Sequence, residues 1–326
     1  MTIKSFSIDY NAVNAKNTFT NGDHLTGQIT VDVSKKTKIR SITLLAKGKT
    51  TVRWTENYGK YTVVYYASEK YFKIEHNILT GNDCDICPGR HVFPFTFQIP
   101  DRNMPSTFKA QRGSIVYSLQ AKLSRSIKIP KKANKMFTFI SKADMSLPGL
   151  MEPQYATKNK KVVFFASGNI TMNIHTERMG YQQGDALKVT ADVTNSSTRT
   201  VKPIFYLYEK KSFFAQGKRR VDTQNLFKEK GESVASSTRQ TVTRFIPIPE
   251  ELPPTILNCQ ILKLEYRLKV VLDIALTRNP QIKLPIVVLP ATPALLQQPP
   301  LYTLNHQMDG PAAKLLEANL LNSTHL

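Results

Sequence analysis

Alternation of apolar and polar side chains is the feature that most constrains the fold of this chain. Every second residue from 262 to 274 is apolar, and the residues between them are charged except for Val271. This period of two is that of a half-buried β-strand, with one face on a core and one in water. The same alternation recurs at residues 25–33 and 115–123, and turn residues such as 21–23 (Asn-Gly-Asp) separate the runs. The sequence therefore predicts an all-β protein built from antiparallel sandwiches, with one short helix at residues 311–321.

A weak internal repeat predicts two similar domains. Residues 19–25 (Phe-x-x-Gly-Asp-x-Leu) match residues 181–187 (Tyr-x-x-Gly-Asp-x-Leu) at an offset of 162 positions. Residues 99–119, which contain Ile-Pro, a later Pro and Tyr-x-Leu, match residues 248–268 at an offset of 149. We expect each Gly-Asp pair to form a tight turn that feeds a strand, with glycine at a position of positive φ. The first domain is then longer by 13 residues, which we place between Gly48 and Gly89.

The length of 326 residues suits two domains of roughly 150 residues each. The strand pattern breaks at residues 148–153, which contain Pro148, Gly149 and Pro153, and it breaks again at Pro290. We predict a first domain over residues 1–147, a linker over 148–160 and a second domain over 161–289. Residues 290–326 are rich in proline and poor in charge, which predicts a disordered tail.

Net charge is the most unusual property of the composition. Lys and Arg total 45 against 24 acidic residues, giving a formal charge of +21, and all of the excess lies before residue 290. Such a field favours phosphates, anionic lipid head groups, acidic peptides or nucleic acid, without choosing among them. We take paired basic residues as the candidate contacts for an acidic cargo or an anionic lipid: Lys131, Lys132, Lys160, Lys161, Lys218, Arg219 and Arg220.

Targeting signals point to the cytoplasm. No apolar run approaches the roughly 18 residues that span a bilayer. The first residues lack the apolar segment of a signal peptide, and three cysteines are an odd number for a disulfide framework. We therefore expect a soluble protein of a reducing compartment.

Several segments together resemble a known family. Residues 89–100 (Gly-Arg-His-Val-Phe-Pro-Phe-Thr-Phe-Gln-Ile-Pro), Trp54 after the strand at 44–48, and residues 114–119 resemble the arrestin-domain-containing proteins, the α-arrestins. Residues 168–170 and 261–266 fit the same family. The likeness covers roughly residues 3–290, and it implies two tandem arrestin-like, immunoglobulin-type β-sandwiches. Phe93, Phe95 and Phe97 alternate with polar residues and proline, so we expect their rings to fill the first core.

The tail carries the motif with the clearest functional meaning. Pro299-Pro300-Leu301-Tyr302 is a PPxY sequence. Adjacent prolines hold the backbone in polyproline II, which docks on the aromatic-lined groove of WW domains, and the tyrosine fills a neighbouring pocket. We predict Pro299, Pro300 and Tyr302 as the WW-binding residues. Only one copy is present, so avidity from a second motif is not available.

The resemblance implies an adaptor rather than an enzyme. Related proteins recruit HECT-type ubiquitin ligases through PPxY motifs and engage the cytoplasmic tails of membrane proteins through the arrestin domains. We therefore expect a WW-domain ligase, membrane-protein cargo and an anionic membrane surface as partners, at the plasma membrane and endosomes. The alternative is a structural trafficking subunit similar to the retromer cargo subunits, with an incidental PPLY. A nucleic-acid binder is the third hypothesis, which we disfavour because the aromatic residues lie mostly on apolar strand faces.

Few motifs in the sequence suggest catalysis, metal binding or redox chemistry. Cys84 and Cys87 form a lone CxxC without the second ligand pair that a structural zinc needs or the βαβ context of thioredoxin chemistry. Some relatives bind thioredoxin through a cysteine of the second domain, but residues 233–236, where we would place it, contain none. Cys259 is interpreted as a core residue. We predict no catalytic residues, no metal and no cofactor.

Overall fold

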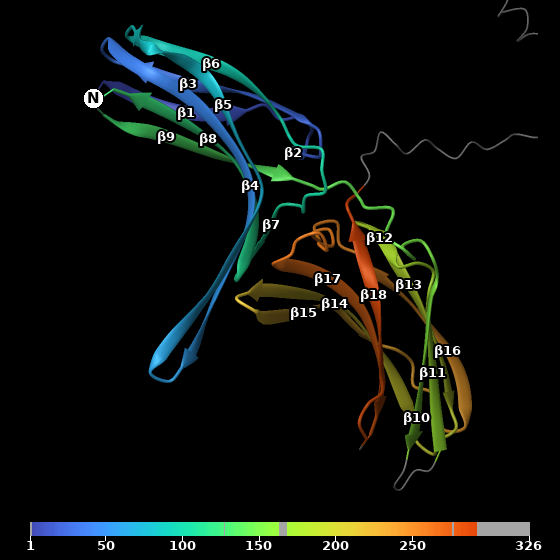
Figure 1. Ribbon diagram of the computed structural model, residues 1–326. Helices are drawn as coiled ribbons and strands as arrows, with labels where there is room; N and C mark the ends of the chain where they lie inside the picture. The colour runs from blue at the N-terminus through green and yellow to red at the C-terminus, as the bar shows by residue number, and fades with distance from the viewer. Residues whose placement is uncertain (1, 127, 163–167, 276, 292–326) are drawn as a thin grey trace, which may run out of the picture. The chain divides into compact units, whose positions relative to one another are not determined.

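The computed structural model describes residues 2–126, 128–162, 168–275 and 277–291, and within these ranges all regular structure is β. The first half of the chain supplies nine strands, shown in blue to green in Figure 1. They are β1 (Ile3–Tyr10), β2 (Thr18–Phe19), β3 (His24–Val33), β4 (Thr37–Tyr58), β5 (Tyr61–Ile86), β6 (Gly89–Gln98), β7 (Phe108–Ala110), β8 (Gly113–Arg125) and β9 (Lys128–Phe139).

The second half also supplies nine strands, from green to red in Figure 1. They are β10 (Gln154–Val162), β11 (Gly168–Thr176), β12 (Gly180–Gln182), β13 (Ala186–Asn195), β14 (Val201–Ala215), β15 (Lys218–Lys230), β16 (Thr238–Pro247), β17 (Leu262–Ile274) and β18 (Gln281–Leu289). The all-β prediction is confirmed. No helix in the described part of the chain is long and apolar enough to cross a bilayer.

Each half folds into two sheets. In the first half a three-stranded sheet of order β1-β3-β6 faces a larger sheet of order β2-β9-β8-β4-β5, to which β7 adds by pairing with β8 (Figure 1). In the second half a sheet of order β10-β11-β13-β16 faces one of order β12-β18-β17-β14-β15. Most neighbouring strands are antiparallel, and the exceptions are β2 with β9 and β12 with β18. The predicted tandem sandwiches are therefore present.

The cores consist of the alternating apolar residues that the sequence pattern marks. In β17 every residue of the apolar set is at most 2% exposed, whereas the residues between them are partly or fully exposed. In β6 the rings of Phe95 and Phe97 are buried as expected, and Phe93 is half-buried against the same core. Phe97 stacks on Phe72 of β5 with ring centroids 5.8 Å apart, which joins the two sheets of the first sandwich.

The internal repeat corresponds to a repeated turn. Gly22 and Gly184 have φ angles of 82° and 88°, so both glycines occupy the left-handed region as predicted. The aspartate that follows accepts a hydrogen bond from a backbone N–H three residues before it: Asp23 Oδ2 from Thr20 at 2.8 Å and Asp185 Oδ2 from Gln182 at 2.9 Å. These side chains close each turn ahead of the next strand.

A tyrosine holds the same loop in both domains. Tyr117 in β8 is fully buried and donates a hydrogen bond of 2.6 Å to the carbonyl of Pro105. Tyr266 in β17 donates one of 2.7 Å to the carbonyl of Pro253. Both prolines lie in the loop that follows an Ile-Pro pair, although the acceptor Pro253 precedes Pro254, the residue that the repeat matches to Pro105. The tyrosine of the second landmark therefore anchors the corresponding loop in both halves. Burial raises the pKa of both phenols far above the usual value, and both remain neutral donors.

The linker is shorter than the sequence pattern indicates. Residues 148–152 are turns and bends, but residues 154–160, which we expected to belong to the linker, lie in β10. This strand pairs with β11 along its whole length, from Gln154 opposite Thr176 to Val162 opposite Gly168. Its residues Lys158–Lys161 are polar and lie at the edge of a sheet. The alternation of apolar and polar residues that predicts a strand is therefore absent there. The predicted tail disorder and the helix at 311–321 lie outside the described residues.

Candidate interaction surfaces

The seven basic residues singled out from the sequence lie on three strands of three different sheets. Lys131 and Lys132 are in β9, Lys160 and Lys161 in β10, and Lys218, Arg219 and Arg220 begin β15. Lys131 is partly buried and its Nζ donates a hydrogen bond of 2.9 Å to the carbonyl of Ile3. The structure therefore does not gather the predicted clusters into one basic surface.

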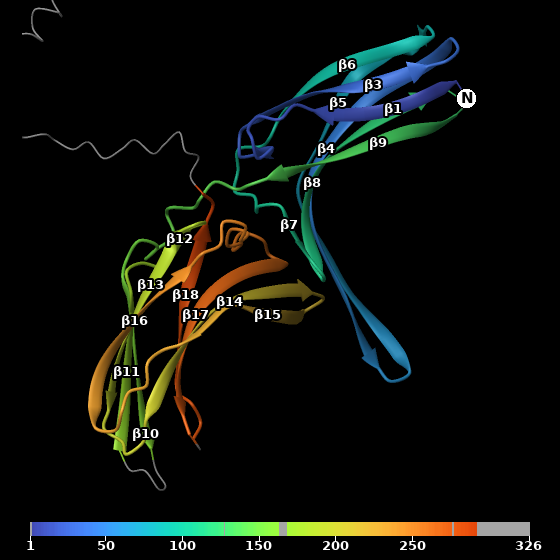
Figure 2. The same cartoon turned by 180° about the vertical axis from the view of Figure 1, so that it is seen from behind.

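A long two-stranded ribbon is the most distinctive feature of the first domain. Pairing between β4 and β8 ends at Val52 opposite Gly113, whereas β4 and β5 stay paired to Tyr58 opposite Tyr61. Figures 1 and 2 both show this ribbon running on beyond the sheet. It occupies part of the interval where the sequence comparison of the two halves placed the extra length of the first domain.

Aromatic side chains cover the end of this ribbon. Trp54 is 5% exposed and stacks on Tyr65 with ring centroids 5.1 Å apart. Tyr58 stacks on Tyr61 at 5.7 Å, and Tyr61 is 63% exposed. Tyr66 is 49% exposed. Exposed tyrosine rings of this kind combine contact area with a hydrogen-bonding hydroxyl, as binding surfaces of proteins do.

One carboxylate, that of Glu56, is hydrogen-bonded to two of these aromatic side chains. Glu56 accepts hydrogen bonds from Tyr58 Oη at 2.7 Å and from Trp54 Nε1 at 3.2 Å. The bond from Tyr58 lowers the pKa of Glu56, and the positive charges of Arg220 and Lys218 lower it further. Lys218 and Arg219 line one shallow hollow with Ala67 of β5, so the predicted basic cluster at the start of β15 lies beside the ribbon, although the two segments are far apart in sequence.

The basic turn of β15 is partly ordered by its own neighbours. The guanidinium of Arg219 donates a hydrogen bond of 2.9 Å to Ser212 Oγ and lies 5.5 Å from the ring centroid of Phe214. All three residues of the cluster are exposed. Among the described ion pairs, none involves Lys218, Arg219 or Arg220, so their charges are available to an acidic ligand.

Polar contacts connect the ribbon-bearing domain to the second domain. Arg112 pairs with Asp222 of β15, and both side chains are partly buried. Glu69 of β5 accepts a hydrogen bond of 2.9 Å from the backbone N–H of Gln260 and lies 3.5 Å from Cys259 Sγ. Cys259 is buried in the core as predicted, and burial raises the pKa of its thiol. A thiol in this setting is a packing residue rather than a reactive one.

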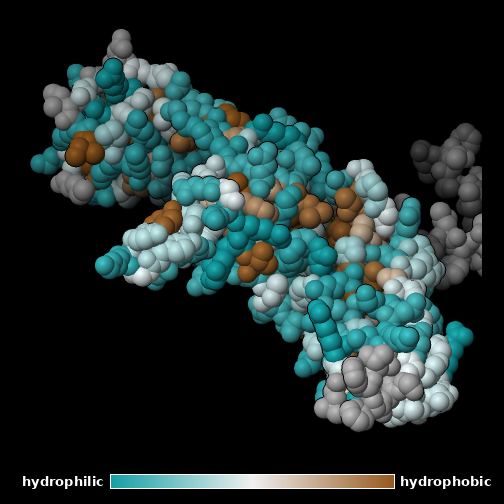
Figure 3. Space-filling model, turned by 60° about the horizontal axis from the view of Figure 1, so that its bottom comes forward, coloured by the Kyte–Doolittle hydropathy of each residue, from teal (hydrophilic) through white to brown (hydrophobic). Residues whose placement is uncertain are grey.

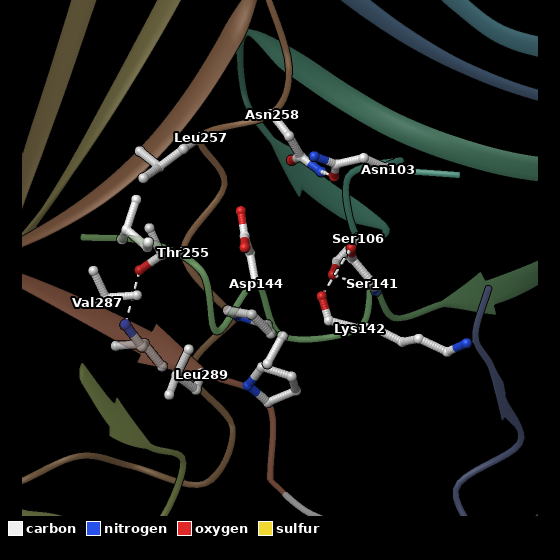
Figure 4. A pocket seen from close by; sticks show the side chains of 15 residues that line it. Asn103, Ser106, Ser141, Lys142, Asp144, Thr255, Leu257, Asn258, Val287 and Leu289 are labelled. Carbon is white, nitrogen blue, oxygen red and sulfur yellow. Dashed lines mark hydrogen bonds between the residues drawn. The ribbon is translucent and has the colours of Figure 1, made fainter. Parts of the chain in front are cut away.

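A small cavity of about 110 Å³ lies where loops of both domains meet. Figure 4 shows its lining, in which the Asp144 carboxylate points into the space and Asn103 meets Asn258. Hydrogen bonds fix its walls: Ser141 N–H donates to Ser106 Oγ at 2.9 Å, and Val288 N–H donates to Thr255 Oγ1 at 2.8 Å. The cavity is too small for a drug-sized ligand. The face in Figure 3 is mainly hydrophilic, with apolar residues in small separate patches.

The residues examined for metal or redox chemistry do not form a site in the described ranges. Cys84 is partly exposed and Cys87 is exposed, and both are free thiols. No group of three or more His, Cys, Asp or Glu side chains able to hold a metal ion occurs among the described residues. The predicted WW-binding residues Pro299, Pro300 and Tyr302 lie outside the described residues.

Sequence reasoning missed two surfaces. The tyrosines at 58, 61, 65 and 66 were a visible signal, since four of them fall within nine residues. A row of lysines across the larger sheet of the second domain was not visible, because its members come from three distant segments.

Comparison with known proteins places the chain in a family. The model of the arrestin (or S-antigen) N-terminal domain matches residues 6–146, and the model of the C-terminal domain matches residues 166–293. Thioredoxin-interacting protein from Rattus norvegicus is 28% identical over 292 residues, which cover 88% of this chain and 74% of that protein. The Homo sapiens protein of the same name is 27% identical over 292 residues, with the same coverage. Arrestin domain-containing protein 4 from Mus musculus is 26% identical over 287 residues, covering 84% of this chain and 69% of the relative. The chain therefore belongs to the arrestin family and is homologous to its α-arrestin members.

Proposed function

We propose that this protein is a non-enzymatic adaptor that couples membrane-protein cargo to a ubiquitin ligase. Its tandem sandwiches would bind the cytoplasmic tail of the cargo, and Pro299-Pro300-Leu301-Tyr302 would recruit a HECT-type ligase through a WW domain. Ubiquitination of the cargo would then direct its endocytosis and endosomal sorting. The protein would act in the cytoplasm, at the plasma membrane and at endosomes.

The PPLY motif is the observation that carries this proposal. It lies 10 residues beyond Leu289, where the last strand of the second sandwich ends, so the motif is separate in sequence from both domains. Its two prolines reduce the conformational entropy that the segment loses on binding. Membership of the arrestin family supports an adaptor role in general. The PPLY motif supports a WW-domain protein as the specific partner.

The described body offers a surface for acidic cargo. The exposed Lys218, Arg219 and Arg220 lie beside the β4–β5 ribbon and make no ion pair in the described ranges. Clustered cations attract acidic or phosphorylated peptide segments, and exposed tyrosines add apolar contact area. We place the cargo tail there, with the ribbon and the start of β15 as its two contacts.

Binding of the full chain to a panel of ligase WW domains tests the ligase half of the proposal. We expect saturable binding that Pro300→Ala and Tyr302→Ala each weaken at least tenfold, because each removes a group that fills the WW groove. Pro311→Ala is the matched control, since it removes a tail proline outside the motif and should leave the affinity unchanged. Isothermal titration calorimetry gives the affinities directly.

Phosphorylation of Tyr302 sharpens the same test. A phosphate adds about −1.5 to −2 charges at neutral pH, which an apolar tyrosine pocket does not accommodate. A tail peptide that carries phosphotyrosine at this position should therefore fail to bind the WW domains that bind the unmodified peptide. If no WW domain binds the full chain, or if the motif variants bind as well as the wild type, the ligase role is refuted. The alternative of a structural trafficking subunit then gains support.

A further inference from the structure

An uncharged segment of the ribbon has one free edge. In the described part of the chain β5 pairs with β4 and with no other strand. From Tyr61 to Ala67 (Tyr-Thr-Val-Val-Tyr-Tyr-Ala) β5 contains no charged residue, no proline and no glycine. We call residues 61–67 the open edge. Its backbone N–H and C=O groups that point away from β4 are free to pair with another strand.

No irregularity of the backbone protects the open edge. The register between β4 and β5 is continuous from Lys49 opposite Lys70 to Tyr58 opposite Tyr61, without a bulge. Among the backbone hydrogen bonds that the described residues make outside the strand ladders, none involves residues 61–67. No loop of the described chain therefore occupies these backbone groups.

The other edge strands of eight or more residues differ from the open edge in composition. Edge strands of natural proteins usually carry a charge, a proline or a bulge that hinders pairing with another chain. Each of these other strands follows this rule, with Asp9 in β1, Arg90 in β6, Lys158 in β10, Arg219 in β15 and Arg244 in β16. The open edge has none of these protections.

The side chains of the open edge favour a strand that pairs further. Val64 is 42% exposed on one face of the ribbon, and Thr62 and Tyr66 are exposed on the same face. On the other face Tyr65 is buried against Trp54, which fixes the orientation of the strand. β-Branched and aromatic residues are those most enriched in strands. The open edge is therefore an ordered strand before any partner binds.

Charge and symmetry indicate which strand fits. The chain carries a formal charge of +21, so most contacts between two copies bring like charges together, whereas the open edge is neutral. Two identical strands that pair antiparallel about a two-fold axis place one residue opposite itself. An axis at Val64 puts Val64 opposite Val64, Thr62 opposite Tyr66, and Val63 opposite Tyr65. Pairs of β-branched and aromatic residues are favourable across strands.

We propose that a second copy of this chain pairs antiparallel with the open edge, with Val64 on the two-fold axis. The two ribbons then form one sheet of order β4-β5-β5-β4. Seven residues make a small interface, so the association is reversible and depends on concentration. The dimer carries two PPLY motifs and so provides the second motif that one chain lacks. That consequence rests on the proposed function, whereas the dimer itself does not.

Sedimentation equilibrium of the full chain across a wide range of concentration measures the dissociation constant of the dimer. Val64→Lys places an ammonium group on the axis, opposite the same group of the other copy, and should weaken the dimer at least tenfold. The side chain of Val64 is partly in solvent, so the folded monomer accommodates lysine there.

Thr55→Lys is the matched control. Thr55 is exposed and lies opposite Val64 on β4, so the change in charge and the face of the ribbon are the same. In the dimer two such lysines are three inter-strand steps of about 4.8 Å apart, or about 14 Å. This separation exceeds the Debye length of about 8 Å at physiological ionic strength, so the control should dimerise like the wild type.

Salt separates this proposal from binding of an acidic cargo. Salt screens the repulsion between two strongly positive chains, so the wild-type dimer should become tighter as sodium chloride is added. Binding of an acidic peptide to Lys218, Arg219 and Arg220 should become weaker under the same conditions. Failure of one proposal is therefore visible without failure of the other.

Disulfide cross-linking tests the register. Directly opposite residues of an antiparallel pair have Cα atoms about 4.5–5.5 Å apart, within the range of a disulfide. In a Cys84→Ser/Cys87→Ser background, which removes the two thiols that are not buried, Val64→Cys should give a covalent dimer with oxidised glutathione. Thr55→Cys in the same background should not.

Four results would overturn the proposal. The first is a monomer at every concentration, which would leave the open edge to a strand of a different protein. The second is equal weakening by Val64→Lys and Thr55→Lys, which would assign the effect to net charge. The third is an unchanged dimer in Val64→Lys, and the fourth is no covalent dimer from Val64→Cys. Thermal unfolding checks that each variant remains folded.

Discussion

The two sandwiches share a turn and a buried tyrosine contact, and they differ in the surfaces that they present. Both contain a Gly-Asp turn with positive φ at glycine, and both contain a buried tyrosine bonded to a loop carbonyl. The first domain extends two strands into an aromatic ribbon, whereas the second keeps its strands within the sheet and aligns Lys228, Lys269 and Lys283 across it. This contrast teaches that the repeated residues maintain the fold. Candidate functional surfaces lie where the two domains differ.

Replacing the two buried tyrosines tests the contact that both sandwiches share, and we expect it to change the free energy of unfolding most. Tyr117→Ala and Tyr266→Ala should each lower the free energy of unfolding by about 3–5 kcal/mol, because each empties a fully packed site. Tyr117→Phe and Tyr266→Phe keep the ring but leave a loop carbonyl without its donor, at a cost of about 1–3 kcal/mol. Urea denaturation followed by circular dichroism measures all four.

The single tryptophan separates the two domains in this experiment. Trp54 lies in β4 of the first domain, so its fluorescence reports that domain. Tyr117→Phe should shift the fluorescence transition more than Tyr266→Phe does. Equal shifts from the two variants would show that the two sandwiches unfold as one unit and not independently of each other.

Substitution at the glycines gives a smaller effect. Gly22→Ala and Gly184→Ala force a side chain into the left-handed region, at a cost of about 1–2 kcal/mol each. Space is available at both positions, since the nearest atoms to an added Cβ are 3.6 Å and 3.5 Å away, so backbone conformation alone decides the cost. Asn tolerates this conformation better, and Gly22→Asn and Gly184→Asn should therefore be milder in a thermal melt. Equal costs for Ala and Asn would point to crowding instead.

The exposed rings of the ribbon should tolerate substitution, whereas its buried ring should not. Tyr61→Ser removes a ring that is 63% exposed, and we expect a change within about 0.5 kcal/mol. Trp54→Ala in the same ribbon should be strongly destabilising, because its ring is buried against Tyr65. Thermal unfolding monitored by circular dichroism compares the two. A large loss from Tyr61→Ser would mean that the exposed ring supports the fold and is not free for a partner.

The local pattern of residues in the sequence was sufficient to predict the architecture. The alternation in β17 predicted both its existence and its buried face, and the Gly-Asp pairs predicted two turns with the correct backbone conformation. The prediction for residues 154–160 was wrong, because β10 is an edge strand whose polar residues carry little periodicity. An edge strand needs only backbone hydrogen bonds on one side, and these leave no mark on the sequence.

By itself, the sequence determined the fold class, the two repeated turns, the burial of Cys259 and the presence of PPLY, since each depends on neighbouring residues or on one motif. Tertiary structure decided which charges meet. It separated the predicted basic pairs onto three sheets and placed Lys218 and Arg220 near Glu56. It also aligned Lys228, Lys269 and Lys283 across a sheet. The physical reason is that register between distant strands results from burying their apolar faces together, so the positions of outer side chains follow from the core.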